Sequence, residues 1–182
     1  TCVEFVRALL AAVQEDFSYE SMFRLLRSGM TGVTMEETDR LENYVLARGI
    51  RGISGWKKEW KYPLKGMEEE ELAELNGLRQ RALGGLQDLK NVLTKNGTDA
   101  ETMTRAIYGY IAELGIQEKL KAREEVFEAE GNLSLAKEYG QIYGMLMELL
   151  DKLVMLLGSC VMTLEEYGEL LDAGLSELKV GL

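Results

Sequence analysis

The chain has 182 residues with a formal net charge of −10, and 46% of them are hydrophobic. This length and this hydrophobic share predict one globular domain, or two small ones, with a buried core. The sequence contains no histidine and only two cysteines, Cys2 and Cys160, which excludes zinc sites, iron–sulfur ligation and imidazole-based catalysis. The acidic balance argues against broad, non-specific nucleic-acid binding, so any DNA contact has to be local.

No stretch of the sequence stays apolar over the roughly 20 residues that a membrane span needs, and no secretory signal opens it. We therefore expect a cytoplasmic protein without a membrane partner, in which both cysteines are reduced. The chain starts within an amphipathic pattern and without methionine, and its last residues form no polar tail. These ends indicate a piece of a longer protein.

Apolar residues recur at helical spacing from the first residues onward. The first stripe lies within residues 3–13 and the second within residues 19–26. Thr34 and Glu37 have the spacing of a capping box, which predicts a helix that begins there and ends near Gly49. A basic, glycine-containing connection follows this helix.

After the run MEEEEL, the helical spacing resumes with Leu72 and predicts one helix of about seven turns that ends at Lys95. Later helices are predicted to begin at two further capping boxes and to end at glycines. The boxes are Thr98 with Glu101 and Thr163 with Glu166, and the terminating glycines are Gly115 and Gly158. Because no alternating strand pattern of convincing length occurs, we predict an all-α fold of about seven to eight helices.

We expect residues 1–182 to form one helical domain, with a subdivision into 1–49 and 66–182 joined by residues 50–65 as the alternative. The longest apolar stripe lies at residues 135–157, in a region where several of the nine methionines gather. Methionines in such a stripe indicate core filling, and a groove for a partner helix is the alternative interpretation.

The segment from Arg48 to Lys65 differs from the rest of the chain and is called the basic segment below. Its sequence is RGIRGISGWKKEWKYPLK, and it contains both tryptophans and the only proline. It carries six cations against Glu59 alone, a local charge of +5 in a chain of −10. Basic residues interleaved with aromatic ones favour nucleic acid through phosphate contacts and stacking. The other interpretation is a connection that anchors itself by burying its indoles while its lysines stay in solvent.

Carboxylates are abundant, above all in the runs MEEEEL and REEVFEAE, where spacings of three and four place acids on one helix face. Two-metal sites in helical bundles use Glu-x-x-His, and this chain has no histidine. We therefore interpret these runs as solvated helix starts and predict no metal site. The sequence also has no glycine-rich phosphate loop, so it offers no nucleotide site.

Residues 16–52 resemble a region of the AddB family, the second subunits of bacterial AddAB-type helicase–nucleases. The family pattern is an aromatic-led YE…FRLLRTGLT, then LENYVLA.GI, then a tryptophan-containing segment. The matching positions here are Tyr19, Glu20, Phe23, Arg24, Leu25, Leu26, Gly29, Leu41 to Ala47, Gly49, Ile50, Gly52, Trp56 and Trp60. Residues 131–182 contain GNLSLAKEYGQIYGMLMELLDKLV and EEYGELLDAGLSELKVGL, which are similar to the family's segment before helicase motif V.

The resemblance implies an all-α insertion of the 2B type from a protein built like a superfamily 1 helicase with a nuclease domain. For the whole protein it implies ATP, magnesium and an iron–sulfur cluster, an AddA-type partner subunit, and ATP-dependent processing of double-strand breaks for recombinational DNA repair. The family's nucleotide-binding loop, cluster cysteines and nuclease carboxylates have no counterpart in this sequence. We therefore expect no catalysis, cofactor or metal within this chain.

The leading hypothesis from the resemblance is an accessory helicase-like domain that contacts duplex or forked DNA and docks on the rest of its own protein. Arg48, Arg51, Lys57, Lys58 and Lys61 would contact phosphates, and Trp56 or Trp60 would pack against the DNA backbone or a base. The alternative is a protein–protein scaffolding module that docks through the apolar helix around residues 146–157 on the partner subunit or motor core. A third interpretation, an independent regulatory helical protein, is disfavoured by the chain ends.

Overall fold

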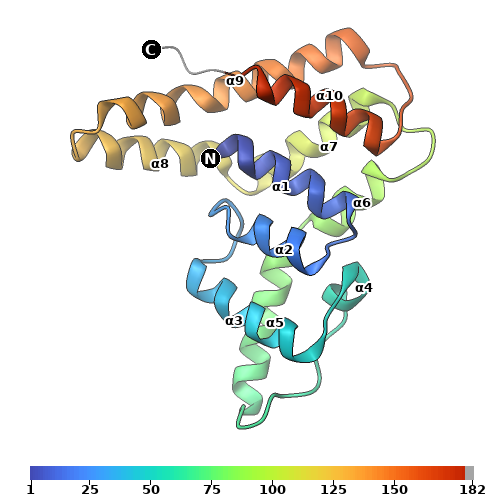
Figure 1. Ribbon diagram of the computed structural model, residues 1–182, viewed down its shortest axis with the longest axis vertical. Coiled ribbons are helices and arrows are strands. Elements are labelled where there is room, and N and C mark those ends of the chain that lie inside the picture. The colour runs from blue at the N-terminus through green and yellow to red at the C-terminus, as the bar shows by residue number, and fades with distance from the viewer. Residues whose placement is uncertain (179–182) are drawn as a thin grey trace. The chain divides into compact units, whose positions relative to one another are not determined.

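The computed structural model of the protein describes residues 1–178 (Figure 1). In these residues the regular structure is helical, and the strand-like pairing amounts to one antiparallel bridge between Asp99 and Val161. The all-α prediction is therefore confirmed. The chain divides into two compact units, residues 1–88 and the described residues from 89 onward, except that Cys2 groups with the second unit. The end of the AddB-like segment, residues 179–182, lies outside the described residues.

The first unit contains the basic segment and the helices on which it packs. These helices are α1 (Cys2–Gln14), α2 (Tyr19–Leu26), α3 (Met35–Arg48), α4 (Gly52–Lys57), α5 (Glu69–Leu83) and the beginning of α6 (Leu86–Leu93). α3 packs on both α2 and α5, and the short α4 packs on α5. The predicted capping box of Thr34 and Glu37 is confirmed at the start of α3, and Gly49 ends that helix in a left-handed conformation. The subdivision at residues 50–65 stays a prediction about independently folding parts.

The prediction of a single helix from the run MEEEEL to Lys95 is wrong. The structure divides it into α5 and α6 at Gly84, whose φ of 42° and ψ of −127° interrupt the helix. Glycine adopts such a conformation with little strain because it has no Cβ. Buried apolar residues continue at helical spacing on both sides of the break, so the spacing does not reveal it. This break and the short α4 explain why residues 1–178 contain ten helices instead of seven to eight.

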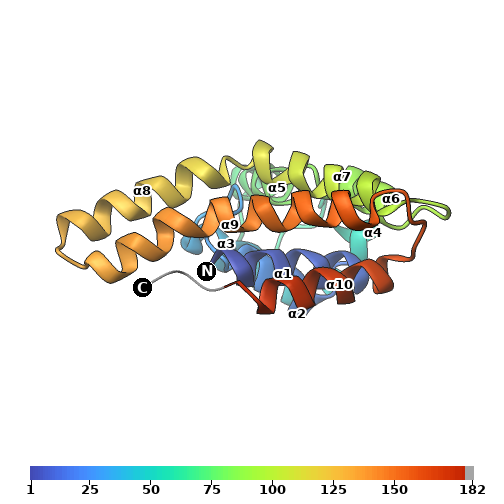
Figure 2. The same ribbon diagram turned by 90° about the horizontal axis from the view of Figure 1, so that it is seen from above.

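The second unit is organised around its longest helix. Its complete helices are α7 (Ala100–Glu113), α8 (Ile116–Ala129), α9 (Leu133–Leu157) and α10 (Leu164–Ser176). α8 and α9 run antiparallel and side by side (Figure 1 and Figure 2), and α9 also packs on α7 and α10. The predicted capping box of Thr163 and Glu166 is confirmed at the start of α10.

The start of α7 differs from the prediction. The expected capping box of Thr98 with Glu101 is absent there, because the N-cap is Asp99. The Asp99 carboxylate accepts a hydrogen bond from the Thr102 amide at 2.8 Å. The Thr98 hydroxyl instead donates to the carbonyl of Lys95 at 2.7 Å and so closes the preceding turn. Threonine and aspartate are both favoured N-cap residues. Asp99 takes this position because the hydroxyl of Thr98 is already bonded to Lys95 in the preceding turn.

A buried hydroxyl pair joins α10 to α7. Tyr167 is fully buried, and its hydroxyl oxygen lies 2.7 Å from that of Thr104. Thr104 donates its own proton to the carbonyl of Ala100, so Tyr167 donates to Thr104. Burial raises the pKa of Tyr167 from 10.0 to about 12.

Alkaline pH is therefore expected to destabilise the second unit. Tyr167 keeps its proton in the folded state up to about pH 12, whereas the unfolded residue ionises near pH 10. The contribution of the buried, protonated Tyr167 to the free energy of unfolding is therefore fully present below pH 10. It is lost as the pH rises from 10 through about 12. A Tyr167→Phe variant should lose about 0.5–1.5 kcal/mol near neutral pH and decline less steeply above pH 10. Urea unfolding followed by circular dichroism measures both effects, and equal declines in the two proteins would contradict this expectation.

Candidate nucleic-acid interface

Aromatic rings from α2, α3 and the basic segment form a continuous chain inside the first unit. Tyr19 lies 5.4 Å from Phe23, Phe23 lies 5.9 Å from Trp56, and Trp56 lies 5.5 Å from Trp60, between ring centroids. Trp60 stacks on Tyr44 at 4.7 Å with an interplanar angle of 19°. The side chains of Trp56 and Trp60 are only 1% and 4% exposed. Both predicted tryptophan contacts are therefore core residues of the first unit, and in this structure neither indole offers a face to a DNA base.

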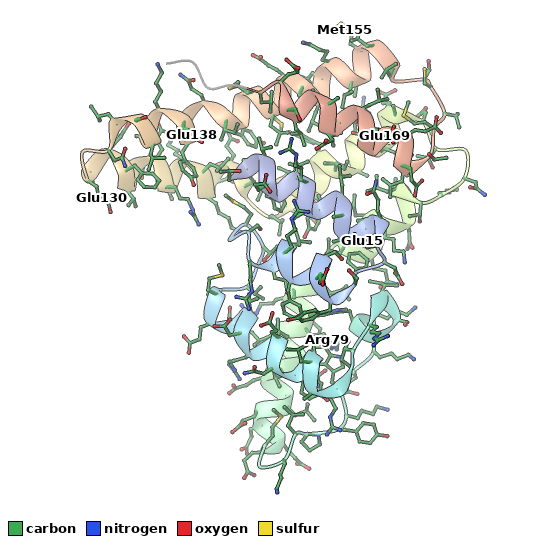
Figure 3. All side chains as sticks on the ribbon, viewed as in Figure 1. Glu15, Arg79, Glu130, Glu138, Met155 and Glu169 are labelled. Carbon is green, nitrogen blue, oxygen red and sulfur yellow. The ribbon has the colours of Figure 1, made fainter. Side chains whose placement is uncertain are left out.

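Two polar residues of α5 hold the basic segment by its backbone. Asn76 accepts from the Trp60 amide and donates to the Trp60 carbonyl, both at 2.9 Å. Arg79 donates from Nη1 to the carbonyl of Trp56 at 2.9 Å and from Nε to Asn76 at 3.0 Å. The Arg79 guanidinium also lies 5.9 Å from the centroid of the Trp60 ring. Figure 3 labels Arg79 inside the first unit, where it is 4% exposed.

The guanidinium of Arg79 remains charged in this buried position, because arginine does not lose its proton in proteins. Burial lowers its pKa, and the nearby carboxylate of Glu59 acts in the opposite direction. Glu59 is the only acid of the basic segment. It therefore lies close enough to Arg79 for the two charges to offset each other in part.

Two further contacts fix the backbone that follows Trp60. The Tyr44 hydroxyl donates to the carbonyl of Tyr62 at 2.7 Å, and the Arg48 guanidinium donates to the carbonyl of Pro63. Both donors come from α3. Arg48, one of the predicted phosphate contacts, is exposed but already uses one of its nitrogens to hold the segment. The backbone of residues 60–63 is thus held from α5 and from α3.

The start of α4 depends on a close approach to Asp16, which lies in the connection between α1 and α2. The Ile53 amide points at the Asp16 carboxylate, with the nitrogen 3.5 Å from Oδ1. A Cβ on Gly52 would lie 2.8 Å from Oδ2 of the same carboxylate, and Gly52 has a φ of +66°. Both the conformation and the space favour glycine at this position.

The remaining cations of the basic segment point into solvent. Arg51, Lys57, Lys58, Lys61 and Lys65 are all exposed. Within residues 1–178 the structure gives none of them an ion pair or a side-chain hydrogen bond. The fold therefore places a group of unpaired positive charges on a backbone that is held in position.

Sequence reasoning missed four residues that shape this interface: Asp16, Tyr44, Asn76 and Arg79. The polar pair on α5 could have been noticed, because Asn76 and Arg79 are separated by three positions and adjoin the apolar positions Leu72, Leu75 and Leu78. Tyr62 was missed as well, although it stands between two lysines of the basic segment. Its side chain is 72% exposed.

A second surface feature lies in the second unit, between α7 and α9. A groove of about 530 Å³ is lined in part by Tyr108, Tyr143, Met147 and Met155. Met155 is 79% exposed and projects from the end of α9 in Figure 3. This groove coincides with part of the helix around residues 146–157 that the sequence indicates as a docking surface.

The described residues 1–178 do not fit a metal ion or an iron–sulfur cluster. Among residues 1–178 no three acids or cysteines are grouped as metal ligands. Cys2 is buried, Cys160 is exposed, and both are free thiols, whereas a cluster of the common kind needs four cysteines. Burial raises the pKa of the Cys2 thiol to about 11, which disfavours the thiolate that binds metals.

The described helices include none that is both long and apolar enough to cross a bilayer.

Comparison with known proteins finds similar sequences that carry one common name. A protein of Lachnoclostridium phytofermentans is 39% identical over 183 residues, and one of Moorella thermoacetica is 40% identical over 193 residues. A protein of Acetivibrio thermocellus is 37% identical over 190 residues. Each alignment covers 99% of this chain, and each protein is named as the B-type subunit of an ATP-dependent helicase/deoxyribonuclease. The chain is similar to one segment of these AddB-type subunits.

The chain spans 16% of the length of the relatives it matches. It corresponds to one segment of these proteins. No protein-family model matches the sequence. The activity named for the relatives belongs to proteins several times longer than this chain.

Proposed function

We propose that this chain, as a segment of an AddB-type subunit, is a non-catalytic accessory domain of the 2B type that contacts DNA phosphates through the basic segment. The observation that carries the proposal is the group of exposed, unpaired cations on a backbone held by Asn76, Arg79 and Tyr44. Phosphate contacts need exposed positive charge at fixed positions, and they supply most of the affinity of non-specific DNA binding. The name of the relatives supports DNA as the partner.

The distribution of charge confines such a contact to the basic segment. The whole chain is at −10, so surfaces outside the segment repel the DNA backbone on average. Arg51, Lys57, Lys58 and Lys61 supply the phosphate contacts, and Arg48 combines a phosphate contact with its hold on Pro63. Trp56 and Trp60 act indirectly, by positioning the lysines from inside the core.

The proposal places all catalysis outside this segment. ATP, magnesium, the iron–sulfur cluster and the nuclease carboxylates belong to other parts of the intact protein, which works with an AddA-type partner in processing double-strand breaks for recombinational repair. This segment then contributes to the path of the DNA and leaves the chemical steps to the rest of the complex.

The test removes the central lysines and compares the result with a matched loss of charge elsewhere. The variant Lys57→Ala/Lys58→Ala/Lys61→Ala should bind labelled forked DNA on the order of 10- to 100-fold more weakly than the wild type at low salt. The control replaces Lys121, Lys137 and Lys152, which are exposed lysines of α8 and α9, and should change affinity little. Fluorescence anisotropy of the DNA measures all three affinities. Equal losses of affinity in both variants would contradict the proposal, because they would show that DNA binding depends only on the total charge of the chain.

The groove on α9 supports a second candidate, a scaffolding module that docks on the partner subunit or the motor core. Exposed Met155 and Leu156, at 79% and 69%, give this surface an apolar edge at the end of α9. Under this candidate, docking on the partner would survive the loss of the three lysines and would be lost when Met155 is replaced by glutamate.

A further inference from the structure

We propose that Tyr62 is the aromatic contact of this interface and that it stacks on an unpaired DNA base, with Lys61 and Lys65 on the neighbouring phosphates. The inference rests on the proposed function and deepens it, because it names single-stranded DNA as the form recognised at this end of the basic segment. It also reassigns the stacking contact that the sequence predicts for the tryptophans.

The exposure of Tyr62 is the first observation. The basic segment has three aromatic residues, and two of them, Trp56 and Trp60, are buried, whereas Tyr62 is 72% exposed. Within the described residues, the Tyr62 ring has no ring contact and its hydroxyl has no hydrogen bond. Large aromatic side chains in such a position are typical of binding surfaces.

The second observation is that the backbone under this ring is already fixed. The Tyr62 carbonyl accepts from the Tyr44 hydroxyl at 2.7 Å, and the carbonyl of Pro63 accepts from Arg48. Two positions earlier, both backbone groups of Trp60 are bound to Asn76. Pro63 follows Tyr62 directly, and its ring fixes its own φ angle, which restricts the backbone at this point further. Binding a base then requires little ordering of the chain beyond the side chain itself, which lowers its entropic cost.

The third observation is the charge beside the ring. Lys61 precedes Tyr62 directly, Lys65 follows three positions later, and both are exposed without an ion pair in the part of the chain that the structure describes. Proteins that bind single strands combine an aromatic platform for the bases with cations for the backbone. In an intact duplex the faces of the bases are already stacked on each other, so a tyrosine on the protein surface can stack only on an unpaired base.

The test compares Tyr62→Ala and Tyr62→Phe in the 182-residue chain, with oligothymidylate as the single strand and a long, fully paired duplex without a loop as the double strand. Stacking on one base is worth enough that Tyr62→Ala should weaken binding of the single strand by about 5- to 100-fold. Tyr62→Phe should retain most of the affinity, because the ring remains. Neither variant should change the binding of the paired duplex or the slope of affinity against salt, because no charge is lost. Tyr108→Ala is the control, since that tyrosine is 50% exposed on α7.

Three outcomes overturn the inference, and each has a different consequence for the proposed function. Wild-type affinity of Tyr62→Ala for the single strand, together with weak binding by the triple lysine variant, leaves a phosphate contact without stacking. Equal losses of affinity of Tyr62→Ala for the single strand and for the paired duplex show that the ring does not recognise an unpaired base. Failure of the wild type to bind either DNA at low salt overturns the inference and the proposed function together.

Discussion

Replacement of Trp56 by alanine is expected to lower the free energy of unfolding of the first unit by about 3–5 kcal/mol. The indole is 1% exposed, and it contacts the rings of Phe23 and Trp60. Its removal leaves a cavity among side chains that are anchored on α2 and α5, so the surroundings can relax only in part. Lys57 and Lys58, which directly follow Trp56, would lose their fixed position as well.

Urea unfolding followed by the emission of the remaining tryptophan measures this loss. Both tryptophans lie in the first unit, so their emission reports on that unit alone. The control is Tyr62→Ala in the same segment, which should change stability by no more than about 0.5 kcal/mol, because the side chain is exposed. An unfolding midpoint of the Trp56 variant that matches the wild type would mean that the indole is no anchor.

Replacement of Arg79 by alanine is expected to lower the stability of the first unit by about 2–4 kcal/mol. The substitution leaves the Trp56 carbonyl without its donor, and it removes the guanidinium from Asn76 and from the Trp60 ring. In the unfolded chain this carbonyl is hydrogen-bonded to water, whereas in the folded variant it would be buried without a donor, which costs free energy. The methylene groups of Arg79 also contribute packing.

Arg81 gives a matched control on the same helix. It stands two positions after Arg79 and pairs with Glu37, and its side chain is 53% exposed. Exposed ion pairs contribute little, so Arg81→Ala should lose at most about 1 kcal/mol. The same denaturant series compares the two variants. Equal losses of stability in the two variants would contradict the role of Arg79 as a buried residue that holds the backbone of the basic segment.

The local features of this fold could be predicted from the sequence. The boxes at Thr34 and at Thr163 were recognisable because a capping box is formed by residues three positions apart. The choice of Asp99 over Thr98 was not, since it depends on the turn that the Thr98 hydroxyl closes. The break at Gly84 was missed for a related reason, because a tolerated glycine and a helix break look the same in the sequence.

The position of the candidate site in the chain was predictable, but which of its aromatic side chains are buried and which are exposed was not. The excess of cations marks residues 48–65, and the same composition suits a stacking surface or an anchor. Burial of Trp56 and Trp60 depends on Asn76 and Arg79, which lie 16 to 23 positions further along the chain. Partners at such separation leave no periodic signal in the sequence. Composition also does not separate the exposed ring of Tyr62 from the buried rings of the two tryptophans.

The salt dependence of binding to forked DNA tests the central claim most directly. The slope of log affinity against log salt concentration counts the phosphates that the protein neutralises. The account predicts a clear negative slope for the wild type and a slope shallower by about 2 to 3 for the variant without Lys57, Lys58 and Lys61. The control without Lys121, Lys137 and Lys152 should keep the wild-type slope. Identical slopes for the wild type and the Lys57/Lys58/Lys61 variant would contradict the account, and the groove on α9 would then be the surface to pursue.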